Sequence, residues 1–227
     1  MFKIAIDGPS GSGKSTLAKN LSRRLGFVYV DTGALYRTVA LYMLRVGIDA
    51  SDKEGVIAAL DSVNVYFKHD EDGSQHVYLN GEDVNAYIRT PEVSMAASAV
   101  SAIGEVRAFL LNTQRDIAKT QNVIMDGRDI GTVIFPDAQV KIFLTAGSDA
   151  RAERRCEELK AKGENVTLED VKNDMIRRDA NDAGRKEAPA IPAEDAVMLD
   201  NSGFAPEDTL ARAMEIISEK IELSGIN

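Results

Sequence analysis

The residues best suited to chemistry lie near the start of the chain, where residues 8–15 match the pattern G-x-x-x-x-G-K-S/T at every fixed position. In this pattern the glycines let backbone N–H groups turn toward one anion, and the following helix adds the positive end of its dipole. We expect Lys14 to reach the β- and γ-phosphates of a nucleotide and Ser15 to ligate Mg²⁺. The predicted nucleotide-binding residues are Gly8, Pro9, Ser10, Gly11, Ser12, Gly13, Lys14, Ser15 and Thr16.

The segments that flank this loop have the composition that such a loop requires. An apolar segment at residues 3–7 predicts a strand, and leucines at positions 17, 21 and 25 predict one face of a helix that Gly26 ends. A chance glycine- and serine-rich turn would not need either neighbour. We therefore predict a nucleotide-binding protein.

Apolar segments alternate with helical ones along most of the chain. Besides residues 3–7, strands are predicted at residues 27–30, 123–125, 140–144 and 197–199. Five strands that alternate with helices predict an α/β fold with a five-stranded parallel sheet and helices on both faces. Ligands bind at the carboxyl ends of such strands, where Gly8, Asp31 and Asp126 would lie along one edge.

The alternation is interrupted near residues 63–84. Two β-like segments, residues 63–67 and 76–79, are followed by an Asn-Gly turn at residues 80–81, which predicts a small antiparallel insert. Capping patterns predict that three helices begin at these places: a capping box at residues 51–54, an N-cap at Thr90, and another N-cap at Thr167.

Composition limits the classes of function. The 227 residues carry a formal net charge of −9, which argues against nucleic-acid and anionic-membrane partners. No apolar run approaches the roughly 20 residues of a membrane span, and no signal peptide is expected. The single cysteine, Cys156, excludes an internal disulfide and favours a cytoplasmic protein. One cysteine and two histidines make a dedicated zinc site improbable.

The remaining motifs bear on the kind of phosphate chemistry. The guanine-reading motif of GTPases, Asn-Lys-x-Asp, and the Walker B run of motor ATPases are both absent. Arginines instead recur through predicted loops and near helix starts, and such a set suits two phosphorylated substrates because guanidinium groups bind phosphate bidentately. Taken singly, each of them fits a solvated surface charge better, and it is the group, with several members placed after strands, that favours phosphate binding. These arginines are Arg37, Arg107, Arg128, Arg178 and Arg185.

Four motifs together resemble the bacterial-type cytidylate kinases, in that family's order and over essentially the whole chain. They are GPSGSGKST (residues 8–16), DTGALYR (31–37), DGRDIGTV (126–133) and RDxxDxxR (178–185). The first motif is common to many nucleotide-binding proteins, whereas the second and third together are quite specific. The antiparallel segment resembles the insert that enlarges the monophosphate-binding region of the bacterial enzymes.

The resemblance implies transfer of the γ-phosphoryl group of ATP to CMP or dCMP, with Mg²⁺ as the metal. It implies Lys14, Arg128 and Arg178 as catalytic residues and Ser15 as the metal ligand. The implied CMP-binding residues are Arg37, Arg128 and Arg185 for the phosphate, Thr32, Arg107 and Asp129 for the base, and Ser98, Arg178 and Asp182 for the ribose. Family members often have serine where this chain has Thr32, so the reach of that hydroxyl group differs slightly.

The resemblance also implies an organisation into parts. We expect a core at residues 1–36, 102–150 and 186–227, a CMP-binding region at residues 37–101, and a helical lid at residues 151–185. Arg154 or Arg155 in the lid could lie near ATP, although both could equally be solvated helix charges. We expect a monomer whose partners are ATP and CMP or dCMP. The sequence does not decide between CMP and dCMP or fix the donor nucleotide.

Two alternatives remain open. Another small-molecule kinase, acting on shikimate, dephospho-coenzyme A or a different nucleotide, would share the first motif but not residues 126–133. A nucleotide-dependent switch would bind ATP tightly and transfer phosphate to no monophosphate. Asp129 has an alternative too, since it could simply pair with Arg128 or cap the following turn.

Overall fold

The computed structural model describes residues 1–70, 73–161 and 163–222. The chain forms two compact units. The first comprises Val28–Val123 together with Met1, and the second comprises Phe2–Phe27 and Ile124–Asn227. The first unit is thus an uninterrupted segment, whereas the second is assembled from the two ends of the chain. The expected division into core, CMP-binding region and lid stays a prediction.

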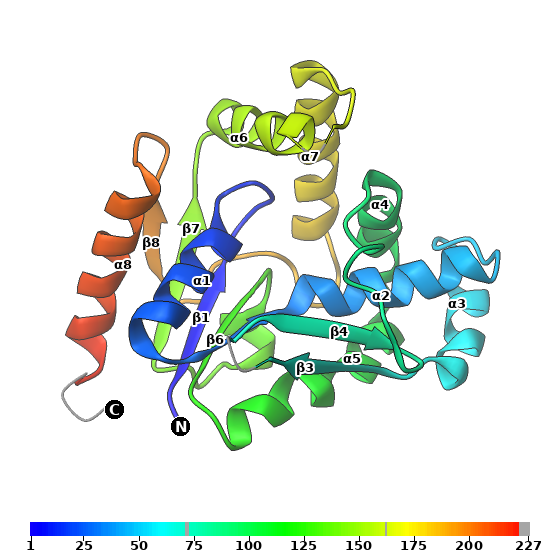
Figure 1. The fold of residues 1–227 in the computed structure, drawn as a ribbon, viewed down its shortest axis with the longest axis horizontal. Coiled ribbons are helices and arrows are strands. Elements are labelled where there is room, and N and C mark those ends of the chain that lie inside the picture. The colour runs from blue at the N-terminus through cyan, green and yellow to red at the C-terminus, as the bar shows by residue number, and fades with distance from the viewer. Residues whose placement is uncertain (71–72, 162, 223–227) are drawn as a thin grey trace. The chain divides into compact units, whose positions relative to one another are not determined.

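A five-stranded parallel sheet confirms the predicted α/β fold (Figure 1). Its strand order is β2-β6-β1-β7-β8. The strands are β1 (Lys3–Asp7), β2 (Val28–Asp31), β6 (Val123–Gly127), β7 (Val140–Thr145) and β8 (Val197–Asp200). In β1, three consecutive residues from Ile4 to Ile6 have no exposed surface, so both faces of this strand are covered, as expected for a central parallel strand.

In the second unit, β1 pairs with β7 so that Ile4 lies opposite Val140, and β7 pairs with β8. Five helical segments accompany these strands: α1 (Lys14–Leu25), η3 (Ile130–Ile134), α6 (Ser148–Ala161), α7 (Leu168–Ala183) and α8 (Pro206–Lys220). Figure 1 shows α6 and α7 beyond the ends of β1 and β7, on the side where the phosphate-binding loop lies. This unit therefore brings the loop and the α6–α7 pair to one end of the sheet.

The first unit contains the predicted antiparallel insert, a sheet of β3 (Val65–His69), β4 (Gln75–Leu79) and β5 (Glu82–Asp83). Its helices are α2 (Thr32–Arg45), α3 (Lys53–Ala59), α4 (Pro91–Val100) and α5 (Gly104–Asp116), with short 3-10 turns η1 (Leu60–Ser62) and η2 (Ile117–Lys119). One apolar core joins these elements: Leu35 and Met43 of α2, Val77 of β4 and Val100 of α4 are fully buried in it. The small residues Ala96 and Ala97 of α4 belong to this core, and α4 contacts α2.

The helix caps show where local sequence decides structure. Thr90 and Thr167 accept hydrogen bonds from Val93 N and Asp170 N, as predicted. The capping box predicted to begin at Ser51 is wrong, because α3 is capped by the neighbouring Asp52, which accepts from Gly55 N. Among the described residues, no single helix is long and apolar enough to cross a membrane, and α4 with the segment at residues 104–119 passes that test only as a pair bent by 102°.

Candidate active site

The phosphate-binding loop has the backbone that only glycine adopts readily. Gly8, Gly11 and Gly13 have φ values of 148°, 71° and 90°, in the left-handed region. A Cβ atom at Gly8 would lie 2.0 Å from the carbonyl oxygen of Leu144 in β7. The first glycine of the motif therefore has two roles: it allows the backbone to turn, and it lets the loop pack closely against β7.

Lys14 lies inside this loop, where its ammonium group donates to Pro9 O at 2.7 Å and to Ser12 Oγ at 3.4 Å. Burial lowers the pKa of Lys14 to about 7, assisted by repulsion from Arg128, against the attraction of Asp126, Asp7 and Asp179. A bound polyphosphate would favour the charged form. The charged form of Lys14 would therefore be more stable with a nucleotide bound than without one.

A hydroxyl–carboxylate pair lies beside the loop. Ser15 Oγ donates to Asp126 Oδ2 at 2.8 Å, and Asp126 is 5% exposed. Hydroxyl and carboxylate oxygens are ligands that Mg²⁺ prefers, and Mg²⁺ sites in such proteins use few protein ligands together with phosphate oxygens. The pair fits the expected metal, whereas no cluster of three or more His, Cys, Asp or Glu residues suited to a metal occurs in the part of the chain that the structure describes.

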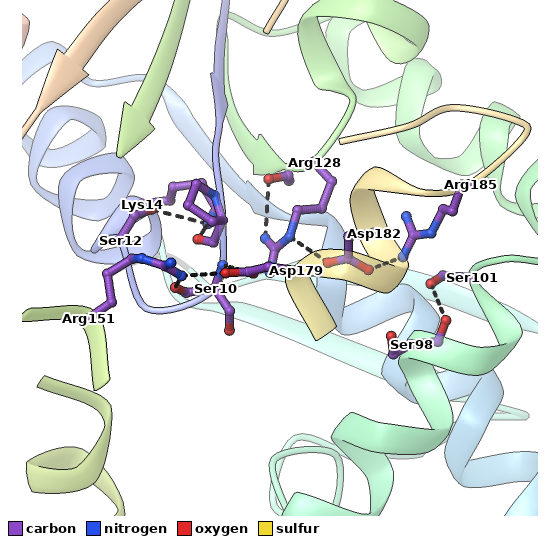
Figure 2. A network of polar contacts seen from close by, with 12 residues as sticks. Ser10, Ser12, Lys14, Ser98, Ser101, Arg128, Arg151, Asp179, Asp182 and Arg185 are labelled. Atoms are coloured by element: carbon purple, nitrogen blue, oxygen red, sulfur yellow. Dashed lines mark hydrogen bonds and ion pairs between the residues drawn. The ribbon is translucent and has the colours of Figure 1, made fainter. Parts of the chain in front are cut away.

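Two of the predicted acceptor-binding arginines meet at the carboxylate of a third predicted residue, Asp182 (Figure 2). Arg128 Nε donates to Asp182 Oδ2 at 2.9 Å, and Arg185 Nη2 donates to Asp182 Oδ1. Asp182 is 5% exposed, and the side chains of Arg185 and Arg128 are 6% and 21% exposed, so most of this cluster is shielded from bulk water. Their like charges are separated by the carboxylate between them, and this arrangement is suited to binding a phosphate group.

The other predicted residues of this unit lie on the same elements. Asp129 is buried directly before η3, a turn of π-helix that the sequence did not predict, and its carbonyl accepts from Val133 N and Ile134 N. Arg178 lies half-buried on α7, one turn before Asp182. Turns of π-helix occur often at functional sites, so the backbone at residues 129–134 is consistent with a binding role.

In the first unit, a second carboxylate holds two arginines. Asp31 Oδ2 accepts from Arg37 Nη2 at 2.7 Å and from Arg89 Nη2 at 3.0 Å, while Asp31 Oδ1 caps α2 through Ala34 N. Burial by itself raises the pKa of Asp31, but Arg37, Arg89 and the cap outweigh it and hold the pKa below its usual value. Within the described chain, Arg37 Nε is buried without a hydrogen-bond partner.

The predicted base and ribose contacts of the first unit are also buried. Thr32 is the first residue of α2, and Arg107 of α5 has its guanidinium 5.5 Å from the ring centroid of Tyr36 while donating to Ser101 O. Ser98 Oγ of α4 is buried and lacks a hydrogen-bond partner among the described residues. A buried polar atom without a partner is costly unless a ligand completes it.

The family model for cytidylate kinase matches residues 4–219. The chain belongs to the cytidylate kinase family. Similar proteins named cytidylate kinase come from Flavobacterium johnsoniae, 45% identical over 97% of both chains, and from Caldanaerobacter subterraneus subsp. tengcongensis, 47% identical over 95% of this chain and 94% of that protein. A third, from Thermotoga neapolitana, is 44% identical over 97% of this chain and 99% of its own.

Among solved structures, an uncharacterized protein from Eubacterium ventriosum matches 96% of this chain and 99% of its own, with a TM-score of 0.52 and 12% sequence identity. At that identity the likeness concerns the fold alone. The assignment to the cytidylate kinase family therefore rests on the sequence relatives, which cover nearly the full length of the chain.

Three contacts beside the predicted residues of this member of the cytidylate kinase family are not evident from the sequence. Asp126 meets Ser15, Arg89 shares Asp31 with Arg37, and Arg151 donates to Ser10 O at 2.8 Å. The sequence does contain a pattern that points to Asp126, because this carboxylate follows three apolar residues at the end of a strand. The pattern is hard to recognise because the Asp-Glu pair of a typical Walker B run is absent. The other two depend on long-range packing, which no local pattern encodes.

Arg154 and Arg155 of α6, which the sequence places in the predicted lid, make different contacts. Arg154 donates to Asn201 Oδ1 and O, and Asn201 Nδ2 in turn donates to Ser12 O at 3.0 Å. Arg155 forms a pair with Glu158 on its own helix. Arg154 therefore reaches the loop through Asn201, while Arg155 is a helix-surface charge.

Asp7, the last residue of β1, fixes the backbone after Arg128 and Asp129. Its two oxygens accept from Ile130 N at 2.8 Å and Gly131 N at 2.7 Å. Burial raises the pKa of Asp7 to about 6, and repulsion from Asp129 adds to this, against the two backbone hydrogen bonds and Lys14. Asp7 thus joins the strand of the phosphate-binding loop to the DGRDIGTV segment.

The raised pKa predicts a pH dependence of stability. The folded state holds the Asp7 proton more tightly than the unfolded state, so this contribution is complete below pH about 4 and is lost as pH rises through about 6. Relative to Asp7→Asn, the free energy of unfolding of the native protein should fall by about 3 kcal/mol between pH 4 and pH 7. Urea denaturation at several pH values measures this difference. Asp149→Asn, at an exposed carboxylate, is the control, and a parallel pH course for Asp7→Asn would contradict the prediction.

Proposed function

We propose that this protein transfers the γ-phosphoryl group of ATP to CMP and dCMP, yielding ADP and CDP or dCDP. The main support is that the chain has a phosphate-binding loop with a buried Lys14 and also two arginine–carboxylate clusters, at Asp31 and Asp182. One nucleotide held by the loop does not require so many guanidinium groups. Membership of the cytidylate kinase family supports cytidine monophosphates as the acceptors.

On the donor side, the backbone N–H groups of residues 11–16, at the end of the loop and the start of α1, bind the ATP phosphates, and Lys14 contacts the β- and γ-phosphates. Ser15 and Asp126 would hold Mg²⁺, and the bound metal would neutralise charge on the phosphate oxygens. The support for this metal is the adjacent hydroxyl and carboxylate pair. The loop glycines let the backbone approach the phosphates closely.

On the acceptor side, Arg37, Arg128 and Arg185 bind the CMP phosphate. Because that phosphate is already an anion, no strong base is required, and the task is to align two polyanions and neutralise the moving phosphoryl group. The unpartnered Arg37 Nε supports a phosphate contact, since a phosphate oxygen would complete it. Arg178 is proposed to contribute both to the ribose contact and to charge neutralisation during transfer.

The nucleoside part of CMP is proposed to contact the remaining predicted residues. Ser98 and Asp182 face the ribose, and each Asp182 oxygen still has a lone pair for a ribose hydroxyl group while accepting from an arginine. Thr32, Arg107 and Asp129 face the cytosine. The Tyr36 ring beside Arg107 restricts the guanidinium group, so its hydrogen-bonding edge is held in place.

We also propose that the protein acts as a monomer in the cytoplasm. The buried thiol of its single cysteine, Cys156, fits a reducing compartment, and the net charge of −9 favours small substrates over nucleic acid.

The test of the function is an acceptor screen. ADP release from ATP and Mg²⁺ is measured with CMP, dCMP, UMP, AMP and GMP for the native protein and for Lys14→Met. Turnover should be highest with CMP and dCMP and should fall by a factor of about 100 or more in Lys14→Met, because charge stabilisation of the transition state is lost. Preference for another acceptor would indicate a different kinase, and tight ATP binding without transfer to any of them would indicate a switch.

A second prediction concerns the grip on the acceptor phosphate. Arg37→Met should raise the KM for CMP by roughly 10-fold or more, since a charge-assisted contact to phosphate is lost, while the KM for ATP changes little. Arg45→Met removes an exposed arginine from the same helix, where it pairs with Glu82, and serves as the matched control. Steady-state kinetics with each substrate varied in turn would contradict the assignment if both KM values rose equally.

A third prediction concerns the base. Cytosine offers an amino donor at N4 and acceptors at N3 and O2, whereas uracil offers an acceptor at O4 and a donor at N3, so a carboxylate beside N4 favours cytosine. Asp129→Asn should therefore reduce the ratio of kcat/KM for CMP over UMP by about 5- to 150-fold, mainly through CMP. An equal loss with both nucleotides would show that Asp129 acts on the structure of the turn.

A further inference from the structure

A loop that directs its N–H groups toward phosphate must satisfy its carbonyl groups from the other side. In this protein the donors are side chains and one backbone amide. Lys14 Nζ donates to Pro9 O, Arg151 Nη1 to Ser10 O at 2.8 Å, and Asn201 Nδ2 to Ser12 O at 3.0 Å, while Leu17 N donates to Gly13 O. Of these four contacts, the one to Ser10 comes from the α6–α7 pair.

The Ser10 residue is held through both its N–H and its C=O (Figure 2). Asp179 Oδ1 of α7 accepts from Ser10 N at 2.9 Å, and Asp179 Oδ2 accepts from Arg151 Nη1 of α6 at 2.5 Å. Since Arg151 also donates to Ser10 O, the carboxylate, the guanidinium and Ser10 form a closed ring of hydrogen bonds. Arg151 Nε is fixed separately by Ala146 O at 3.0 Å.

This ring is largely withdrawn from solvent. The side chains of Arg151 and Asp179 are 11% and 20% exposed. Beside them, a Cβ atom at Gly11 would lie 2.7 Å from Met175 Cε and 3.1 Å from Arg151 O. Met175 belongs to the apolar cluster between α6 and α7 that includes Cys156. The helix pair is thus packed against the loop with no space for a side chain at Gly11.

We propose that Asp179 is a positioning residue for ATP. Through Arg151 and the Ser10 N–H group, it makes the conformation of the phosphate-binding loop depend on the α6–α7 pair being packed against it. Asp179 touches neither substrate in this scheme. The loop then binds ATP with full affinity only when α7 is in place, and this adds to the proposed function a link between donor binding and the helix pair.

The alternative is that the same pair merely stabilises the fold. A buried ion pair that only joins α6 and α7 would lower the melting temperature when broken and would leave nucleotide affinity intact. The proposal instead requires ATP affinity to change and CMP affinity to stay the same. It further requires Asp179 and Arg151 to act as one unit, so their effects on ATP affinity must not add.

The experiment compares Asp179→Asn, Arg151→Met and the double variant, with Asp174→Asn as a control at an exposed carboxylate of the same helix. Calorimetry gives the Kd for ATP, steady-state kinetics give both KM values, and a thermal scan gives the melting temperature. Each single variant should raise the Kd for ATP by about 10-fold or more, and the KM for CMP should stay within about twofold of the native value. The Kd of the double variant should not exceed that of the single variant with the larger loss.

Three outcomes would overturn the proposal: ATP affinity within about twofold of the native protein, additive losses in the double variant, or an equal rise in both KM values. If Asp179→Asn does not fold, Arg151→Lys gives the same test, because an ammonium group keeps the charge but does not reproduce the planar guanidinium contacts. The inference rests on the proposed function only for the KM values. ATP binding is measured without an acceptor, so failure to phosphorylate CMP and failure of this inference give different results.

Discussion

Repulsion between closely placed cationic side chains is the constraint on which much of this structure depends. Lys14, Arg128 and Arg185 are largely withdrawn from water, where like charges interact strongly. Each is opposed by a carboxylate that is itself buried, such as Asp182 beside the two arginines. The lowered pKa of Lys14, caused by burial and then by Arg128, shows that the compensation is incomplete at that residue. A bound polyphosphate would supply the missing negative charge.

The fold meets this constraint with carboxylates at the ends of strands. Asp7 and Asp31 end β1 and β2, Asp126 lies next to last in β6, and all three are buried. Each uses its oxygens differently: Asp7 holds backbone amides, Asp31 holds two arginines and a helix cap, and Asp126 accepts from Ser15. Strand ends suit this purpose because the rigid sheet fixes their position while the next residues are free to turn.

Features encoded locally could be predicted from the sequence. The loop, five strands, the antiparallel insert and the caps at Thr90 and Thr167 each depend on neighbouring residues. The cap at residues 51–52 could not be assigned in this way, because serine and aspartate are both good caps and the structure pairs Ser51 Oγ with Asp49 instead. Arg89 and Asp179 act across long stretches of chain, and their partners are decided by tertiary packing that a single sequence does not display.

The discontinuity of the second unit has a consequence for the order in which the newly made chain folds. Strand β1 pairs with β7, so the pairing of Ile4 with Val140 can form only after Val140 has been synthesised. The first unit, apart from Met1, is one continuous segment. Domains made of consecutive residues can collapse while the ribosome is still adding the rest, and pairings between distant residues form late because closing a long loop is entropically costly. The phosphate-binding loop, although it is translated before β7, is therefore expected to be among the last parts of the molecule to take its final form.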